Sequence, residues 1–246
     1  VGAPIPYYAM SAQRYMHEYG VTAEAIAEVP VRLRVHAADH PLAQFRKPLT
    51  VEEVLSSPVL SPPIHLPEAA SVSTGAAAAV VTRASRARET HRVRIAGWGE
   101  FHDPSHFISP SAPLTRFVSM ERAAADAFAE AGMMPGDVDV AEIYGVFAAT
   151  ELVAYESLGF FEKGEAARAV AEGRTTWGGD VVMNPTGGRL SLGHPAGATP
   201  LYEVAEIVRQ LRAKAWGRQV EGAGVGLAQA EHGMMNGAAV VILERS

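Results

Sequence analysis

Cysteine is absent from all 246 residues of the sequence. Within these residues, its absence excludes disulfide bonds, thiolate metal ligands and a cysteine nucleophile. Long apolar runs are absent too: none approaches the roughly twenty residues that a membrane-spanning helix requires. The Walker A, Gly-x-Ser-x-Gly and strand-linked Gly-x-Gly-x-x-Gly patterns are also missing, so the sequence carries none of these nucleotide-binding or hydrolase signatures.

Positive charge is in short supply. The 21 Lys and Arg residues are outnumbered by 27 Asp and Glu, and the net charge of -6 argues against nucleic acid as a partner. A hydrophobic fraction of 48% with 20% charged residues is typical of one large or two small globular domains. The N-terminus lacks the basic segment and apolar core of a signal peptide, so we expect cytoplasmic residence. The sequence does not begin with Met, and we expect it to be a fragment of a longer chain.

The first third of the chain carries helix signals. Aromatic residues and Met at helical spacing predict a helix within residues 1–20 that ends at Gly20. Thr22 is a candidate N-cap for a second helix. Residues 31–37 either extend this helix or form a strand. Thr50 and Glu53 form a capping-box pattern that predicts a short third helix. Proline-rich residues 56–67 predict irregular structure.

An alternation of strand and helix patterns follows. The small apolar run at residues 76–81 predicts a buried strand, and a charged linker at 85–90 marks a domain boundary. From residue 92 onward we expect an α/β layered domain with helices on both faces of a sheet. In such sheets, the loops after strand C-termini gather on one edge and build the site. The expected strands are 93–98, 137–144, 224–229 and 238–243, and the expected helices are 120–131, capped by Ser119, 147–158, 164–172 and 201–216.

The most concentrated stretch is residues 184–200, which hold four glycines, three prolines and one histidine. Such a loop lets backbone approach a ligand and aims one titratable side chain at it. His194, between Gly193 and Pro195, is a candidate general base or donor to an oxyanion. The helix start after Gly197 offers free N–H groups to anionic or carbonyl oxygens. The alternative is a loop histidine with no role, and we favour function.

Two further side chains belong to the candidate site. Tyr144 ends a predicted strand. Its hydroxyl either donates a functional proton or hydrogen bond, or belongs to a half-buried strand tyrosine that has no function. His232 lies in the turn between the last two strands and is either functional or a surface histidine. Two His/Asp clusters, at residues 36–40 and 102–106, are too short and too loop-like to favour a metal site, so we expect none.

With these residues in view, the sequence resembles the thiolase superfamily, and within it the sterol-carrier-protein-x type. Residues 184–199 match the family pattern Asn-Pro-x-Gly-Gly, followed by Gly-His-Pro-x-Gly-Ala-Thr. The remaining matching blocks cover nearly the whole chain and lie at residues 15–20, 48–54, 75–78, 142–147, 158–160 and 163–165.

The resemblance implies a thiolase-like layered α/β fold, made of two similar halves and a loop domain. Residues 1–65 would form a loop-domain-like region, 66–90 the end of the N-terminal half and 91–246 the C-terminal half. It also implies a homodimer that takes a coenzyme A thioester as substrate, with no permanently bound cofactor. Asn184, Gly193 and Gly197 would contact the CoA thioester. The first part of the N-terminal half, absent here, normally supplies a nucleophilic cysteine.

The sequence departs from the family at the acid/base positions. The family's oxyanion-binding His in the second block is Tyr144 here, and its acid/base Cys is Val146. The final strand-to-strand turn, which supplies the cysteine in other members, has none. The residues left to act as a base are His232, Glu231 and His194.

Three interpretations remain open. One is an enzyme that makes or cleaves a carbon–carbon bond on a lipid or steroid acyl-CoA, by acyl transfer or by retro-aldol chemistry like that of thiolase-like aldolases. The second is an acyltransferase that uses a cysteine from the missing part together with His194. The third is a weakly catalytic subunit that works with a small OB-fold, zinc-ribbon (DUF35-type) partner.

Overall fold

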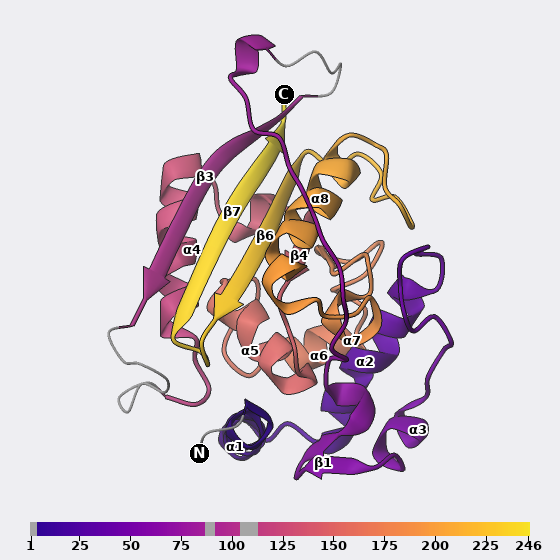
Figure 1. Ribbon diagram of the computed structural model, residues 1–246. Coiled ribbons are helices and arrows are strands. Elements are labelled where there is room, and N and C mark those ends of the chain that lie inside the picture. Colours follow the sequence, from indigo (N-terminus) through magenta and orange to yellow (C-terminus); the bar gives the residue numbers. More distant parts are fainter. Residues whose placement is uncertain (1–3, 87–91, 104–112) are drawn as a thin grey trace.

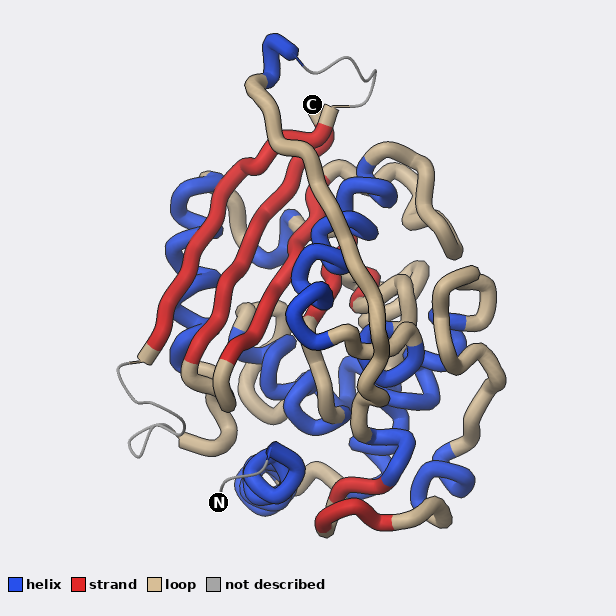
Figure 2. Tube along the Cα trace, viewed as in Figure 1, coloured by secondary structure: helices blue, strands red, loops and turns tan. Residues whose placement is uncertain are grey.

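The computed structural model describes residues 4–86, 92–103 and 113–246, and its main feature is a mixed five-stranded sheet of order β3-β7-β6-β4-β5 (Figure 1). β4 pairs in parallel with β5 and β6, whereas β7 is antiparallel to β6 and β3. This sheet, flanked by helices, confirms the predicted α/β fold (Figure 2). The strands are β3 (Val93–His102), β4 (Val140–Ile143), β5 (Val182–Met183), β6 (Val225–His232) and β7 (Gly237–Arg245).

Helices cover both faces of the sheet. Figure 1 shows α4 (Val118–Ala131) behind β3 and β7, and α8 (Thr199–Leu211) in front of β6 and β4. Glycine allows α4 to lie against β3, because a Cβ at Gly99 would be 2.1 Å from the carbonyl oxygen of Ala123. α4 begins one residue before the predicted cap, Ser119, whose hydroxyl instead donates to the Met235 carbonyl at 3.4 Å.

The N-terminal region forms three helices and a small hairpin. The hydroxyl of Thr22 accepts a hydrogen bond from the Ala25 N–H at 3.3 Å, and Thr50 and Glu53 form the predicted capping box. Residues 31–37 continue the second helix. The irregular structure predicted for residues 56–67 is wrong in part, because two short strands pair there. The elements are α1 (Pro4–Tyr19), α2 (Ala23–Ala37), α3 (Val51–Leu55), β1 (Val59–Ser61), β2 (Ile64–His65) and the 3-10 turn η1 (Leu66–Glu68).

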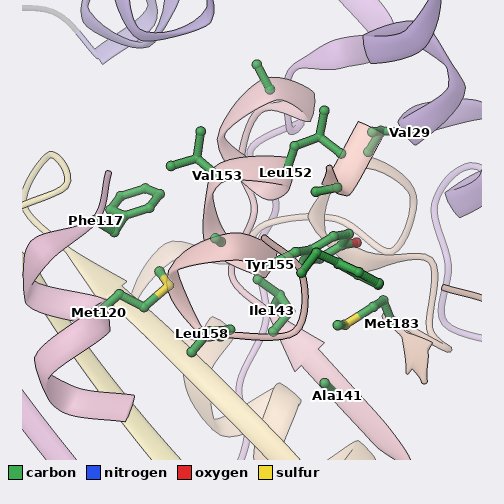
Figure 3. Packing of buried hydrophobic residues seen from close by; sticks show 14 of the residues in the cluster. Val29, Phe117, Met120, Ala141, Ile143, Leu152, Val153, Tyr155, Leu158 and Met183 are labelled. Carbon is green, nitrogen blue, oxygen red and sulfur yellow. The ribbon is translucent and has the colours of Figure 1, made fainter. Parts of the chain in front are cut away.

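The core centres on α5 (Ala148–Ser157), which is buried on every side. Figure 3 shows Tyr155 of this helix beside Ile143 of β4, with Leu152 and Val153 on the opposite side of the helix. A helix that is buried on every side needs neighbours on all sides, and here α1, α2, α4 and α6 supply them, with α4 in turn packed on β3 and β7. α5 therefore joins the N-terminal helices to the sheet. The remaining elements are η2 (Ala84–Arg86), η3 (Pro135–Asp137), α6 (Ala166–Ala171), α7 (Gly188–Ser191) and η4 (Ala196–Ala198).

The buried strand predicted at residues 76–81 is wrong. This segment has no regular structure, and Val80 and Val81 are 95% and 78% exposed. Within the described residues, no strand lies beside it to accept its backbone hydrogen bonds. Instead the chain crosses in front of α8 (Figure 1), where Gly75 lies against Tyr202.

Parts of two predicted segments, residues 87–90 of the linker and 104–106 of the second polar cluster, lie outside the described residues. The domain limits at residues 65 and 90 stay predictions. Over the part of the chain that is described, no helix has the length and apolar character to span a bilayer.

Candidate active site

Asn184 holds together the ends of the two neighbouring strands that carry the site. The residue follows β5 in the left-handed conformation, with φ of 49°. Its side-chain oxygen accepts the Ile143 N–H at 2.7 Å, and its amide nitrogen donates to Glu151. Asn184 is fully buried, so its side-chain amide supports the site from inside the protein and is not exposed at an open surface. The next residue after β4, Tyr144, donates its N–H to the side-chain oxygen of Gln229 at 3.1 Å.

Tyr144 and His194 meet in space. The Tyr144 hydroxyl lies 3.4 Å from Nε2 of His194, and the two rings are perpendicular, with centroids 5.2 Å apart. On its other side, Nδ1 of His194 lies 3.0 Å from the hydroxyl of Thr199. A threonine hydroxyl that donates to Nδ1 leaves the imidazole proton on Nε2, beside Tyr144. The structure thus brings together two of the predicted site residues.

The backbone of the histidine loop is held by a segment far upstream. The N–H of His194 donates to the Ser71 carbonyl at 3.1 Å and to the Ser73 hydroxyl at 2.9 Å. The Ser73 N–H returns a hydrogen bond to the His194 carbonyl at 3.0 Å. Gly193 has φ of +114°, and a Cβ there would lie 2.6 Å from the Ser73 hydroxyl. Only glycine fits this position without displacing its neighbours.

Both side chains of the pair are neutral near pH 7. Burial, together with the charge of Arg189, lowers the pKa of His194 to about 4. Burial, reinforced by Glu231 and Glu203, raises the pKa of Tyr144 to about 12. A neutral imidazole of low pKa is a weak base, whereas a phenol and an imidazole N–H are both good hydrogen-bond donors. The pair is therefore suited to binding an oxygen that gains negative charge.

A buried charged cluster lies behind this pair and supports the loop. Arg189 is fully buried and donates to the Gly193 carbonyl at 3.4 Å. Its guanidinium also lies 3.4 Å from Glu142 and 3.7 Å from Glu203. Burial raises the pKa of Glu142 to about 7, even though Arg189 acts in the opposite direction. The cluster thus ties the loop backbone to β4 and α8.

Glu231 lies at the end of β6, on the strand next to Tyr144. The hydroxyl of Tyr8, from α1, donates to its Oε1, which also accepts the Met235 N–H at 3.1 Å. The Tyr8 ring packs against Phe147, with centroids 4.8 Å apart. Burial raises the pKa of Glu231 to about 7. A carboxyl group with a pKa near neutrality is suited to acid/base chemistry.

The structure does not bring His232 to this site. The side chains of Glu231 and His232 alternate across β6, so they point to opposite faces of the sheet. His232 stacks on His102 at a centroid distance of 5.0 Å, and its Nε2 lies 4.0 Å from Glu100. Gly197 is exposed on the 3-10 turn before α8, with open space around its Cα.

A cavity of about 240 Å³ adjoins the histidine loop. Gly193 and Pro195, on either side of His194, form part of its wall. The cavity combines aromatic and aliphatic surface with buried polar groups, as small-molecule sites do. The remaining lining residues are His40, Leu42, Gln44, Ser73, Thr74, Thr186, Leu192, Tyr202, Glu206 and Trp216.

In the part of the chain that the structure describes, no three His, Asp or Glu side chains are placed to hold a metal ion. His36, from the first polar cluster, is used within the protein. Its Nδ1 lies 3.1 Å from the carbonyl oxygens of both Met183 and Asn184, and its Nε2 lies 2.9 Å from the Thr176 hydroxyl. Burial lowers the pKa of His36 to about 4. This histidine therefore anchors α2 to the end of β5.

The comparisons with known proteins show the family of the chain. The family profile described as "Thiolase C-terminal domain-like" matches residues 99–245, more than half of the chain. The chain belongs to the thiolase superfamily. It is 39% identical over 250 residues to the acetyl-CoA acetyltransferase of Methanothermobacter thermautotrophicus, covering 97% of this chain and 62% of that protein. It is 34% identical over 243 residues to the sterol carrier protein 2 of Oryctolagus cuniculus, covering 96% of this chain and 44% of that protein.

A solved structure shows the same fold. The structure named "Ltp2-ChsH2(DUF35) aldolase" superposes with a TM-score of 0.87 at 28% identity, covering 99% of this chain and 64% of that chain. This thiolase-superfamily chain thus spans between about two fifths and two thirds of the length of these relatives.

Proposed function

We propose that this protein makes or cleaves a carbon–carbon bond on an acyl-CoA thioester. The neutral Tyr144–His194 pair, at 3.4 Å, carries the proposal. Breaking or forming the bond next to a thioester creates an enolate, whose charge resides largely on the thioester oxygen. Two preorganised donors at that oxygen stabilise the enolate more than the starting ester. The cavity beside Gly193 and Pro195 supplies space for part of the substrate.

Retro-aldol cleavage of a β-hydroxyacyl-CoA is the reaction that fits the residues present. It requires a base and an enolate-binding site but no cysteine, and the 246 residues contain none. The likeness to a structure named as an aldolase supports the same reaction class. The coenzyme A thioester is the substrate, and the reaction requires no permanently bound cofactor.

Acyl transfer is the second candidate. Its support is the 39% identity to a protein named acetyl-CoA acetyltransferase, of which the chain covers 62%. In this reaction a cysteine outside these residues takes up the acyl group. Tyr144 and His194 then stabilise the enolate of the second thioester.

A protein partner is part of the proposal. The name of the aldolase structure, Ltp2-ChsH2(DUF35), includes a DUF35 protein. We propose a partner of the same type, a small OB-fold, zinc-ribbon protein, for this chain, and association of the chain as a homodimer.

The test replaces Tyr144 with Phe in the full protein, co-expressed with its partner. Loss of one oxyanion donor lowers kcat by about 100- to 1,000-fold. Turnover is measured with β-hydroxyacyl-CoA substrates and with pairs of acyl-CoA substrates. Tyr19→Phe, on α1, is the matched control and keeps wild-type turnover.

Equal turnover by Tyr144→Phe and wild type would remove Tyr144 from the mechanism. Mass spectrometry of the protein after incubation with acyl-CoA separates the two candidates. Retro-aldol chemistry leaves no acyl adduct, whereas acyl transfer leaves one on a cysteine.

A further inference from the structure

The direction of the side chains at the end of β6 determines which of the three candidate bases lies near the Tyr144–His194 pair. β4 and β6 are parallel, with Ile143 opposite Gln229, so the chain after Ile143 runs alongside residues 230–231. Gln229 and Glu231 point to the same face because side chains alternate along a strand. Gln229 accepts the Tyr144 N–H, and the charge of Glu231 raises the pKa of Tyr144, so Glu231 lies near Tyr144. His232 points to the opposite face of the sheet.

Tyr8 holds Glu231 in this position. Its hydroxyl donates to Oε1 of Glu231, and the Met235 N–H donates to the same oxygen at 3.1 Å. Tyr8 is 3% exposed and Glu231 is 7% exposed, so both groups are shielded from bulk water. Two donors on one oxygen fix the carboxyl plane and stabilise its charged form.

We propose that Glu231, held by Tyr8, is the acid/base group of the site. Tyr8 is a positioning residue, and Glu231 exchanges the proton with the substrate. The inference rests on the proposed function, because it assigns the base that an enolate-forming reaction on a thioester requires.

One carboxylate is sufficient for both proton transfers of the reaction. In the retro-aldol direction, Glu231 takes the proton of the β-hydroxyl group, and the O–H electron pair becomes the second bond of the new carbonyl. The Cα–Cβ bond breaks, and its electron pair forms the enolate whose oxygen accepts hydrogen bonds from Tyr144 and His194. Protonated Glu231 then returns the proton to Cα. The products are a carbonyl compound and a shortened acyl-CoA, and Glu231 is again a carboxylate.

The groups around Glu231 suit this cycle. The charge of Glu231 raises the pKa values of the phenols of Tyr7, Tyr8 and Tyr144. A phenol is neutral near pH 7 already at its ordinary pKa, so all three are neutral there. Burial raises the pKa of Glu231, and the Tyr8 hydrogen bond opposes that rise. The carboxylate therefore takes up and releases a proton near neutral pH.

A second buried tyrosine–glutamate pair offers a matched control. Tyr15, two helical turns further along α1, donates to Glu156 on α5. Both residues are buried, and Glu156 also accepts the Ala166 N–H at 3.1 Å. The Tyr15–Glu156 pair repeats the hydrogen bonding of the Tyr8–Glu231 pair but contacts neither Tyr144 nor His194 in any hydrogen bond of the described residues. Removing it therefore reports the structural cost alone.

The experiment follows exchange of the α-hydrogens of acetyl-CoA in D₂O by NMR, together with cleavage of β-hydroxyacyl-CoA. Both use the full protein with its partner. We expect Glu231→Gln to lower both rates by about 100- to 10,000-fold. Glu231→Asp restores part of the rate. Tyr8→Phe keeps measurable activity but moves the rising limb of the pH–kcat profile to higher pH, because Glu231 loses a hydrogen bond that lowers its pKa. Tyr15→Phe and Glu156→Gln leave the profile unchanged.

Each other outcome has a distinct meaning. Wild-type exchange and cleavage in Glu231→Gln would overturn the assignment of Glu231 and leave the proposed function in place. A Tyr8→Phe profile with an unshifted limb would remove Tyr8 from the pair. Absence of both reactions in the wild-type protein, across the thioester panel, would overturn the inference and the proposed function together.

Discussion

Individual hydrogen bonds set the tautomer of His194. Nδ1 faces the Thr199 hydroxyl at 3.0 Å, and Nε2 faces Tyr144. With the pKa of His194 lowered to about 4, the ring stays neutral across the physiological range, so only its tautomer matters. The residue that selects the tautomer is therefore as important as the ring itself.

Thr199→Val tests this selection. One such hydrogen bond contributes about 1 to 1.5 kcal/mol, so we expect kcat to fall roughly tenfold, with KM little changed. Steady-state kinetics measures the effect. Thr199→Ser keeps the hydroxyl and serves as the control. A tenfold loss in Thr199→Ser as well would point to packing at the start of α8 instead of the hydroxyl.

The histidine loop was predictable from local sequence, whereas the contact between Tyr8 and Glu231 was not. Glycine and proline around His194 mark a stiff loop, and the strand pattern before Tyr144 predicts its place at a sheet edge. Tyr8 lies 223 positions from Glu231, and its helical spacing indicates only a buried helix face. The strand predicted at residues 76–81 failed for a related reason. Pairing depends on neighbours that a local pattern does not contain.

At the level of elements, β4, α5 and α8 each bury a glutamate near Arg189. Glu151 on α5 accepts hydrogen bonds from Tyr155 at 2.6 Å and from Asn184. Burial raises the pKa of Glu151 to about 8, from an ordinary value of 4.5. Between these two values the folded protein holds a proton that the unfolded chain has released. Stability therefore falls as pH rises through this window.

Glu151→Gln removes that proton uptake while keeping an acceptor for Tyr155 and Asn184. We expect the variant to melt several degrees above the wild type at about pH 8 and to match it at about pH 5. Thermal unfolding monitored by circular dichroism across pH provides the measurement. Glu52→Gln, on the exposed face of α3, is the surface control. If the melting temperature of Glu151→Gln changed with pH in parallel with that of the wild type, other groups would be the cause of the pH dependence.

At the level of the whole molecule, the strands of the five-stranded sheet pair with one another, whereas residues 76–82 pair with no strand of the described residues. β3 is paired with β7 in a register of nine residue pairs, whereas residues 76–82 have no regular structure and are mostly exposed. Backbone amides with no hydrogen bond exchange freely with solvent.

Hydrogen–deuterium exchange of the 246-residue chain checks this contrast. We expect the amides of residues 76–82 to exchange within seconds, and those of β7 to remain protected over hours. Mass spectrometry of peptic fragments gives both values in one experiment. Protection at residues 76–82 equal to that of β7 would mean that the segment pairs with another strand in solution.

The backbone bonds between residues 71–73 and His194 also bear on protein engineering. Substrate range is commonly altered by exchanging loops between relatives, one loop at a time. Here the backbone of the histidine loop is held in part by hydrogen bonds to Ser71 and Ser73, which lie outside the loop. Residues 71–75 and 193–199 therefore form one transferable cassette. A chimaera that receives both segments from the same parent keeps the imidazole in place, and one that receives a single segment loses it.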